Sequence, residues 1–444
     1  MLNYIWLGLI VAAVLMGGAT GHLKELTDGT FDSAKTAVTI ALGLVGVMAL
    51  WLGIMRLAEK SGLVQVLARG LRPVLRLLFP EVPPEHPAMG AMVMNIASNM
   101  LGLGNASTAL GLRAMQRLEE LNPHPGTATN AMCTFLAINT SSVQLIPATA
   151  VAILASAGST NPTAIIGTAL AATSCAAVAA IVAVKTLERV PLFAEKNEAV
   201  QGGIEPERRE GSEPGLDSPA PPPLRWWGMA ILGLLTLCFA DWFVRDAFHP
   251  RFLPGAPAPS GAEGTAWVRA ISTVGVLAIP FIVSFFPLYA FARGVKVYEE
   301  FIEGAKEGFN VAIRIIPYLV AILVAVGMFR AAGGIQMLAQ ALGPVLDRIG
   351  FPADLLPVVL VRPLSGGATL GLFAELVKAH GPDSFIARTA GTIMGSTETT
   401  FYVLAVYFGS VGIRRTRHAV LAGLTADFTG VVVSFVICKA VFRN

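Results

Sequence analysis

Four groups of polar residues interrupt long apolar stretches of this sequence, and polar side chains in such places usually mark a solute or ion site. The first two groups supply amides and hydroxyls: Asn95, Asn99, Asn105, Ser107 and Thr108, then Asn139, Thr140, Ser141, Ser142 and Gln144. The other two add charge: Arg362, Ser365 and Thr369, then Ser396, Thr397, Glu398, Thr399 and Thr400, with Asp427 on the final apolar stretch. The pattern predicts a binding site for a small polar solute.

Glu398 is the residue that we expect to matter most, because an isolated acid inside an apolar stretch is costly unless it has a function. It is suited to carry a proton, to bind a cation or to accept hydrogen bonds from a solute. Two alternatives stay open: Glu398 forms a structural ion pair with Arg362, or Arg362 extends its side chain to the membrane surface. Asp427 is a second acid for which a structural role is equally compatible.

Other kinds of chemistry find no support in the sequence. The six His residues show no HExxH spacing and no cluster with Cys, so no metal site and no cofactor is predicted beyond a coupling cation, Na⁺ or H⁺. No GxSxG motif or catalytic pair of acids is present, so we do not expect an enzyme. The four Cys residues lie in apolar runs, and a net charge of +3 gives no reason to expect a nucleic-acid partner.

Composition places these residues in a lipid bilayer. The 444 residues are 54% hydrophobic and only 14% charged, and the mean hydropathy is +0.65; soluble domains carry about a quarter charged residues. A bilayer core needs about 20 apolar residues per helix. About nine transmembrane helices are predicted on this criterion, at residues 2–20, 36–57, 128–157, 162–185, 226–245, 267–291, 310–330, 384–409 and 418–440. The fold class is therefore an all-α polytopic membrane protein.

Two further apolar regions, 88–118 and 353–378, are each interrupted by a Gly-rich polar stretch. Their arms of about 10–15 residues are too short to cross a bilayer alone. Both regions are therefore predicted to be re-entrant helical hairpins; two ordinary spans kinked at Gly are the alternative. Residues 62–78 and 333–349 show helical spacing of apolar residues with polar ones between, which is typical of helices lying along the membrane interface.

Matching residues in the two halves indicate an internal repeat. At a constant offset of 271, Lys35 aligns with Lys306, Gln65 with Gln336, and Pro73-Val74-Leu75 with Pro344-Val345-Leu346. The polar runs 139–142 and 397–400 align at an offset of 258. We therefore divide the chain into a first repeat (1–189), a charged, Pro-rich flexible linker (190–225), an extra transmembrane helix with an external loop (226–266) and a second repeat (267–444).

Two arguments predict that the repeats have inverted topology. Five crossings separate equivalent points, and an odd number reverses the second copy. Lys and Arg also concentrate in the loops that are cytoplasmic if the N-terminus is inside, such as 56–76, 185–225 and 414–417. We expect a multi-pass protein of the bacterial cytoplasmic (inner) membrane with a cytoplasmic N-terminus and an external C-terminus. Inverted repeats with discontinuous helices are typical of secondary transporters.

Several stretches resemble a known family. NMLGLGNASTALGLRAM and NAMCTFLAINTSS are similar to spore maturation protein A, and RPLSGGATLG, GSTETTFYVLAVYFGSVGI and LTADFTG to spore maturation protein B. The chain thus resembles a fusion of the two. Both carry the nucleoside-recognition, or gate, domain, which concentrative nucleoside transporters and the ferrous-iron transporter also contain. The resemblance implies a transport-type core but not a nucleoside cargo, since the Gln-Thr-Glu hairpin motif is absent, and no GxxxxGK[ST] loop supports a GTPase-coupled iron permease.

The function that we expect is a cation-coupled secondary transporter or permease for a small polar solute, nucleoside-like or other, held between the two hairpin tips and two broken helices. The alternative is a non-transporting membrane scaffold of envelope assembly or of spore maturation, where the family's role concerns core dehydration. The scaffold needs no hydrated cavity beside Glu398, so a cavity discriminates between the two. The sequence leaves open whether the chain forms a homo-oligomer in the lipid bilayer.

Overall fold

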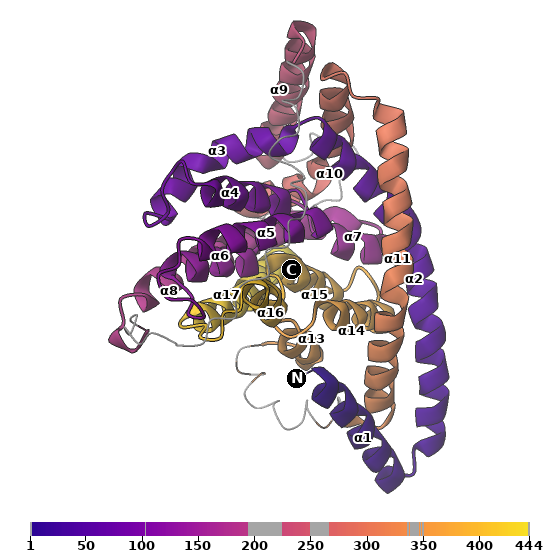
Figure 1. Cartoon of the computed structure of the whole chain (residues 1–444). Helices are drawn as coiled ribbons and strands as arrows, with labels where there is room; N and C mark the ends of the chain where they lie inside the picture. The colour runs from indigo at the N-terminus through magenta and orange to yellow at the C-terminus, as the bar shows by residue number, and fades with distance from the viewer. Residues whose placement is uncertain are drawn as a thin grey trace.

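The computed structural model describes residues 2–102, 104–193, 224–248, 266–334, 337, 346, 348 and 350–442. These residues form sixteen α-helices, so the predicted all-helical fold is confirmed (Figure 1). Most of the linker, the loop after the extra helix and most of the predicted interfacial segment 333–349 lie outside the described residues. The side chain of Asn105 lies outside them too.

The first half of the chain contains eight α-helices before the linker. They are α1 (Leu2–Thr20), α2 (Leu23–Lys60), α3 (Leu63–Leu78), α4 (Pro87–Met100), α5 (Gly104–Glu119), α6 (Asn130–Ser141), α7 (Ala148–Ser156) and α8 (Ile165–Leu187). The second half repeats much of this order. It contains α9 (Trp226–Phe248), α10 (Ala266–Ala292), α11 (Val297–Ala331), α13 (Leu356–Val361), α14 (Gly366–His380), α15 (Phe385–Ser396), α16 (Thr400–Ser410) and α17 (Ala419–Phe442).

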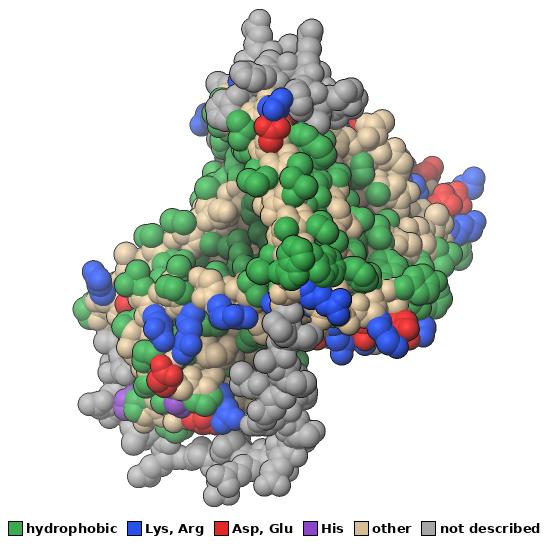
Figure 2. Space-filling view, turned by 90° about the horizontal axis from the view of Figure 1, so that it is seen from above, with side chains coloured by type: hydrophobic (Ala, Val, Ile, Leu, Met, Phe, Trp, Pro, Cys, Tyr) green, Lys and Arg blue, Asp and Glu red, His purple; other side chains and the backbone are tan. Residues whose placement is uncertain are grey.

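Five helical segments in the described part of the chain are long and apolar enough to cross a bilayer. They are Leu23–Lys60, Pro162–Leu187, Trp226–Asp246, Ala266–Ala292 and Ala419–Phe442. Figure 2 shows a broad hydrophobic surface with Lys and Arg side chains gathered along its border, as expected where apolar surface meets the polar headgroups. The chain is therefore a multi-pass helical membrane protein.

The structure corrects the bounds of two predicted spans. The expected span 36–57 is the end of the 38-residue α2, and the expected span 310–330 is the end of the 35-residue α11. Each helix begins with a charged, amphipathic segment that hydropathy does not detect, because the polar face lowers the average over any window. Both helices are longer than a bilayer core requires, since about 20 residues suffice.

The spans predicted at 128–157 and 384–409 are each broken in the middle. The first divides into α6 and α7 at Ser142, which has a φ of 31° and so lies in the left-handed region, followed by Pro147. The second divides into α15 and α16 at Thr397, whose backbone is extended. A residue in the left-handed region ends helical hydrogen bonding. Both breaks fall within the polar runs of the sequence, which confirms that these runs disrupt the helices.

The region 88–118 is a helical hairpin rather than one kinked helix. Asn95 on α4 donates to the carbonyl oxygen of Ser107 on α5 at 2.7 Å, and the Ser107 hydroxyl returns a bond to the Asn95 carbonyl at 3.3 Å. These two bonds require α4 and α5 to fold back on each other around Gly102, which has a φ of 73°. In the second half, α14 packs against the much shorter α13 in the same way.

Helices α2 and α11, which correspond in the repeat, lie side by side along most of their length (Figure 1). A Cβ atom on Gly308 would lie 2.5 Å from Ala49 Cα, and one on Gly29 would lie 3.5 Å from Ala331 Cβ. Residue numbers fall on α2 as they rise on α11, so the two helices are antiparallel. Glycine allows this close approach because it has no side chain in the contact.

The corresponding pair α8 and α17 is also antiparallel. At one end, the Phe193 ring just after α8 packs edge-on against His418 just before α17. At the other end, Thr392 joins the two helices, because its hydroxyl contacts Thr168 at 2.8 Å and Cys438 at 3.2 Å. The start of α8 therefore lies near the end of α17.

Candidate functional site

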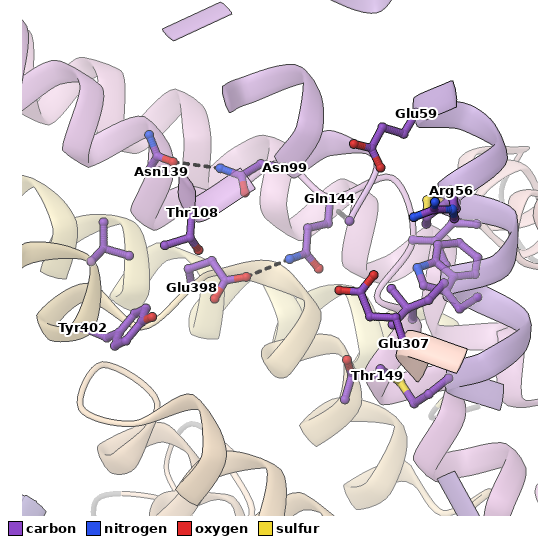
Figure 3. A pocket seen from close by; sticks show the side chains of 18 of the residues that line it. Arg56, Glu59, Asn99, Thr108, Asn139, Gln144, Thr149, Glu307, Glu398 and Tyr402 are labelled. Atoms are coloured by element: carbon purple, nitrogen blue, oxygen red, sulfur yellow. Dashed lines mark hydrogen bonds between the residues drawn. The ribbon is translucent and has the colours of Figure 1, made fainter. Parts of the chain in front are cut away.

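A cavity of about 430 Å³ lies where both helix breaks and the tip of the first hairpin meet. Helices α2, α4, α5, α6, α7, α11 and α16 contribute side chains to its wall (Figure 3). Five predicted site residues line it: Asn99, Thr108, Asn139, Gln144 and Glu398. The cavity is large enough for a small organic solute, because small-molecule sites start at about 300 Å³.

Glu398 lies in the second helix break and faces Gln144 in the first. The Gln144 amide nitrogen donates to Glu398 Oε1 at 2.8 Å across the cavity wall (Figure 3). Glu398 is partly exposed to the cavity, so its carboxylate is accessible to a solute or a cation. The repeat therefore pairs an acid from one half with an amide from the other.

Amide groups of the first hairpin form a buried network with the first broken helix. Asn99 donates to Asn139 Oδ1 at 2.8 Å, and the Ser107 hydroxyl donates to Asn99 Oδ1. The Tyr407 hydroxyl lies between Asn95, 3.3 Å away, and Asn139 Oδ1, 3.4 Å away. Apart from Asn95 Oδ1, which has no partner in the described structure, the amide groups of this network are bonded to one another or to neighbouring groups. The network is therefore a rigid support for the site.

Backbone hydrogen bonds tie the breaks to each other and to the hairpins. The amide of Glu398 donates to the Thr140 carbonyl at 2.7 Å and so joins the two breaks directly. The amide of Leu145 donates to the Met100 carbonyl at 3.0 Å, and that of Phe401 donates to the Pro363 carbonyl at 2.9 Å. Each broken helix is thus held by the first arm of the hairpin in its own half. This satisfies backbone groups that a broken helix leaves without intrahelical partners.

Arg362 holds the second break and does not form the alternative ion pair with Glu398. Its guanidinium donates to the carbonyls of Met394, at 2.9 Å, and of Thr397. No ion pair joins Arg362 to Glu398 in the described residues, so that alternative is wrong. The side chain is only 4% exposed, which excludes the other alternative, extension to the surface. A cation beside the last carbonyls of α15 complements the negative end of that helix.

The second buried acid, Asp427, lies behind the break rather than in the cavity wall. Its Oδ2 accepts a hydrogen bond from the Thr400 hydroxyl at 2.6 Å, whereas Oδ1 has no partner in the described structure. Asp427 is 5% exposed. This arrangement supports the start of α16.

Most of the other predicted residues that the structure describes lie at helix ends, and none of them lines the cavity. Ser365 caps α14 by accepting from the Ala368 amide at 3.2 Å, and Thr369, Ser141 and Ser396 donate to carbonyls of their own helices. The hydroxyls of Thr140 and Ser142 are buried without a partner in the described structure. Seven polar or aromatic residues of the cavity wall are not among the predicted site residues: Trp51, Arg56, Glu59, Thr149, Glu307, Tyr402 and Tyr407. Each lies outside the polar runs, in a predicted span or in a segment between predicted spans.

The comparison with known proteins finds the same domain in both halves of the chain. A family model described as Gate, nucleoside recognition, matches residues 41–186 and 312–414. The two matched segments begin 271 residues apart, which is the offset that aligns the repeats in the sequence. The repeated gate domain is therefore confirmed.

Two proteins of Bacillus subtilis (strain 168) are each similar to one half of the chain. Spore maturation protein A is 42% identical over 182 residues, which are 41% of this chain and 93% of the relative. Spore maturation protein B is 45% identical over 177 residues, which are 40% of this chain and 99% of the relative. The N-terminal half resembles the first and the C-terminal half the second, as expected for a fusion of the two. No solved structure matches the chain.

Proposed function

Because the chain belongs to the Gate nucleoside-recognition family in both of its halves, we propose that it is a secondary transporter or permease for a small polar solute. The cavity beside Glu398 is the observation that carries this proposal, because a scaffold has no need of one. The cavity lies between two broken helices, and such helices frame the substrate sites of secondary transporters. Gln144 and Glu398, one from each half, are the solute-binding groups that we place at its centre.

We propose that the two halves have inverted topology and that the two hairpins are re-entrant. The antiparallel packing of α2 with α11, and of α8 with α17, supports this arrangement, since corresponding helices must run in opposite directions in inverted repeats. The N-terminus would be cytoplasmic in a bacterial inner membrane. Helix α9 supplies the additional crossing that reverses the second half.

We propose that a cation, Na⁺ or H⁺, is coupled to the solute through Glu398. A carboxylate that changes its charge or its partner within the membrane is the usual coupling group in transporters. The bond between the Glu398 amide and the Thr140 carbonyl supports this role. Because this bond joins the two helix breaks, binding of a cation or a proton at Glu398 would affect both breaks together.

The test needs no knowledge of the cargo, because a transporter exposes its site alternately to the two sides of the membrane. In a variant whose four Cys are replaced by Ala, Thr149→Cys places a thiol in the cavity wall. We expect a membrane-impermeant thiol reagent to label this thiol when added to either face of proteoliposomes. Lys296→Cys, in the loop before α11, is the control and should react from one face only.

Labelling of Thr149→Cys from a single face would contradict transport and support the alternative of a scaffold. The names of the two relatives refer to spore maturation. A scaffold in that process would keep its cavity closed to one side throughout. The experiment therefore separates the two functions directly.

A further inference from the structure

The charged groups that line the cavity are mostly acidic. Three carboxylates face it, those of Glu59, Glu307 and Glu398. The guanidinium of Arg56 is the one basic group among the described lining residues, and it is paired with Glu300 at 2.8 Å. The cavity therefore has a negative potential that attracts cations.

The three carboxylates are spread around the cavity and do not form a cluster. Glu59 and Glu307 are exposed and lie on one side of Gln144, whereas Glu398 lies on the other side beside Tyr402 (Figure 3). No group of three His, Cys, Asp or Glu residues is close enough to hold a metal ion among the residues searched. A bare metal ion needs several oxygen ligands at about 2–2.6 Å, so this spacing suits a larger cation.

Aromatic groups complete the wall. Trp51 and Tyr402 line the cavity, and aromatic rings attract organic cations over their faces. Trp51 is 8% exposed, and its indole N–H has no hydrogen-bond partner in the described structure, next to the first hairpin tip at Gly102. A buried donor without a partner costs stability, so its place in the wall indicates that a ligand atom completes its bonding.

We propose that the cavity binds an organic cation, an amine or guanidinium compound that also carries a hydrogen-bond acceptor for Trp51. The exposed acids Glu59 and Glu307 attract the cation to the mouth, and Glu398 pairs with its charged nitrogen. Gln144 holds the Glu398 carboxylate in place through its amide nitrogen. The inference rests on the proposed function and names the chemical class of its solute.

Thermal unfolding of the full-length protein in detergent tests the ligand class. The probes are ethanolamine and arginine methyl ester as cations that carry an acceptor oxygen, uridine as a neutral nucleoside and succinate as an anion. We expect ethanolamine or arginine methyl ester at millimolar concentration to raise the melting temperature by at least 2 °C, and uridine and succinate to leave it unchanged. The shift should disappear in Glu398→Gln and should shrink in Glu307→Gln.

Glu303→Gln is the matched control for Glu307→Gln. Glu303 also lies on α11, is paired with Lys306 and does not line the cavity. This variant should keep the full shift. A shift with uridine or succinate but with neither cation would overturn the proposal, as would a cation shift that survives in Glu398→Gln. If neither cation raises the melting temperature while Thr149→Cys is labelled from both faces, the ligand class is refuted and the transport function is not. A cation shift with one-sided labelling would refute transport alone.

Discussion

In the part of the chain that the structure describes, one side-chain partner and one backbone hydrogen bond hold Glu398 in position. The carboxylate accepts from Gln144, and the amide of the same residue donates to Thr140. The side chain is therefore oriented without being neutralised by a basic group among the described residues. An acid held in this way can exchange its partner for a proton, a cation or a solute.

Glu398→Gln should abolish function and leave expression and folding intact. The amide oxygen that replaces the carboxylate can still accept from Gln144, so we expect stability to change by less than about 1 kcal/mol. Complementation of a deletion strain measures function, and the melting temperature in detergent measures folding. Full complementation by this variant would contradict a coupling role for Glu398.

His418 makes the stability of the protein depend on pH. It is 0% exposed, and neither ring nitrogen has a hydrogen-bond partner in the described structure. Burial, together with the nearby charges of Arg417 and Lys185, lowers the pKa of His418 from 6.5 to about 4. The folded state therefore holds its proton less tightly than the unfolded state does.

The melting temperature should consequently fall as the pH is lowered from about 6.5 towards 4, because protonation favours the unfolded state in this range. The loss of stability attributable to His418 should reach about 3 kcal/mol. His418→Phe removes the titrating group and keeps a ring against Phe193, so its melting temperature should decline less over the same range. An identical pH profile for the two proteins would show that His418 does not contribute.

At the scale of helices, α2 and α11 form the most extensive contact between the two halves. Glycine residues make this contact close: a Cβ atom on Gly304 would lie 2.5 Å from the Leu52 carbonyl oxygen, and one on Gly53 would lie 2.6 Å from the Phe301 ring. Close helix packing in a membrane depends on such small residues, since the lipid offers no hydrophobic driving force between helices.

Gly308→Val should separate the two helices, because its side chain would overlap the backbone of α2 at Ala49. Overpacking of this kind costs about 1–3 kcal/mol and should lower the melting temperature. Gly46→Val is the control on α2, since nothing lies within 4 Å of a Cβ atom there. Equal melting temperatures for the two variants would show that the glycines are not required for the packing.

The sequence predicts the helix breaks and the first hairpin well, because polar runs, Pro147 and Gly102 are local signals. It does not predict that α2 and α11 extend beyond the spans 36–57 and 310–330. It therefore misses Glu59 at the end of α2 and Glu307 in the first part of α11, which share a cavity with Glu398 only through the packing of those helices. Trp51 and Tyr407 lie in apolar stretches that predict transmembrane spans, so the sequence does not indicate that they line a cavity. The ion pair between Arg362 and Glu398 was suggested by opposite charge, but backbone carbonyls of α15 occupy the guanidinium instead.

At the scale of the whole molecule, the arrangement of the halves predicts opposite sidedness at corresponding points. Gly62 and Gly333 correspond in the repeat but have φ values of 77° and 81°, so a side chain there would strain the backbone. The corresponding pair Lys60 and Ala331, at the ends of α2 and α11, avoids this strain.

Lys60→Cys should be labelled from the cytoplasmic face of intact cells or oriented vesicles, and Ala331→Cys from the external face. Both variants belong in the background without native Cys. A membrane-impermeant maleimide applied before and after permeabilisation measures the sidedness of each thiol. Labelling of both thiols from the same side would refute the inverted topology.

The bond between the Glu398 amide and the Thr140 carbonyl has a consequence for how the two halves can evolve. It uses main-chain atoms only, so a side-chain replacement at either position leaves its donor and acceptor in place, with proline at position 398 as the exception. The runs Asn139–Ser142 and Thr397–Thr400 already differ in sequence although they correspond in the repeat. Substitutions can therefore change the side chains of the site in one half of the chain while the backbone hydrogen bond between the two halves is kept.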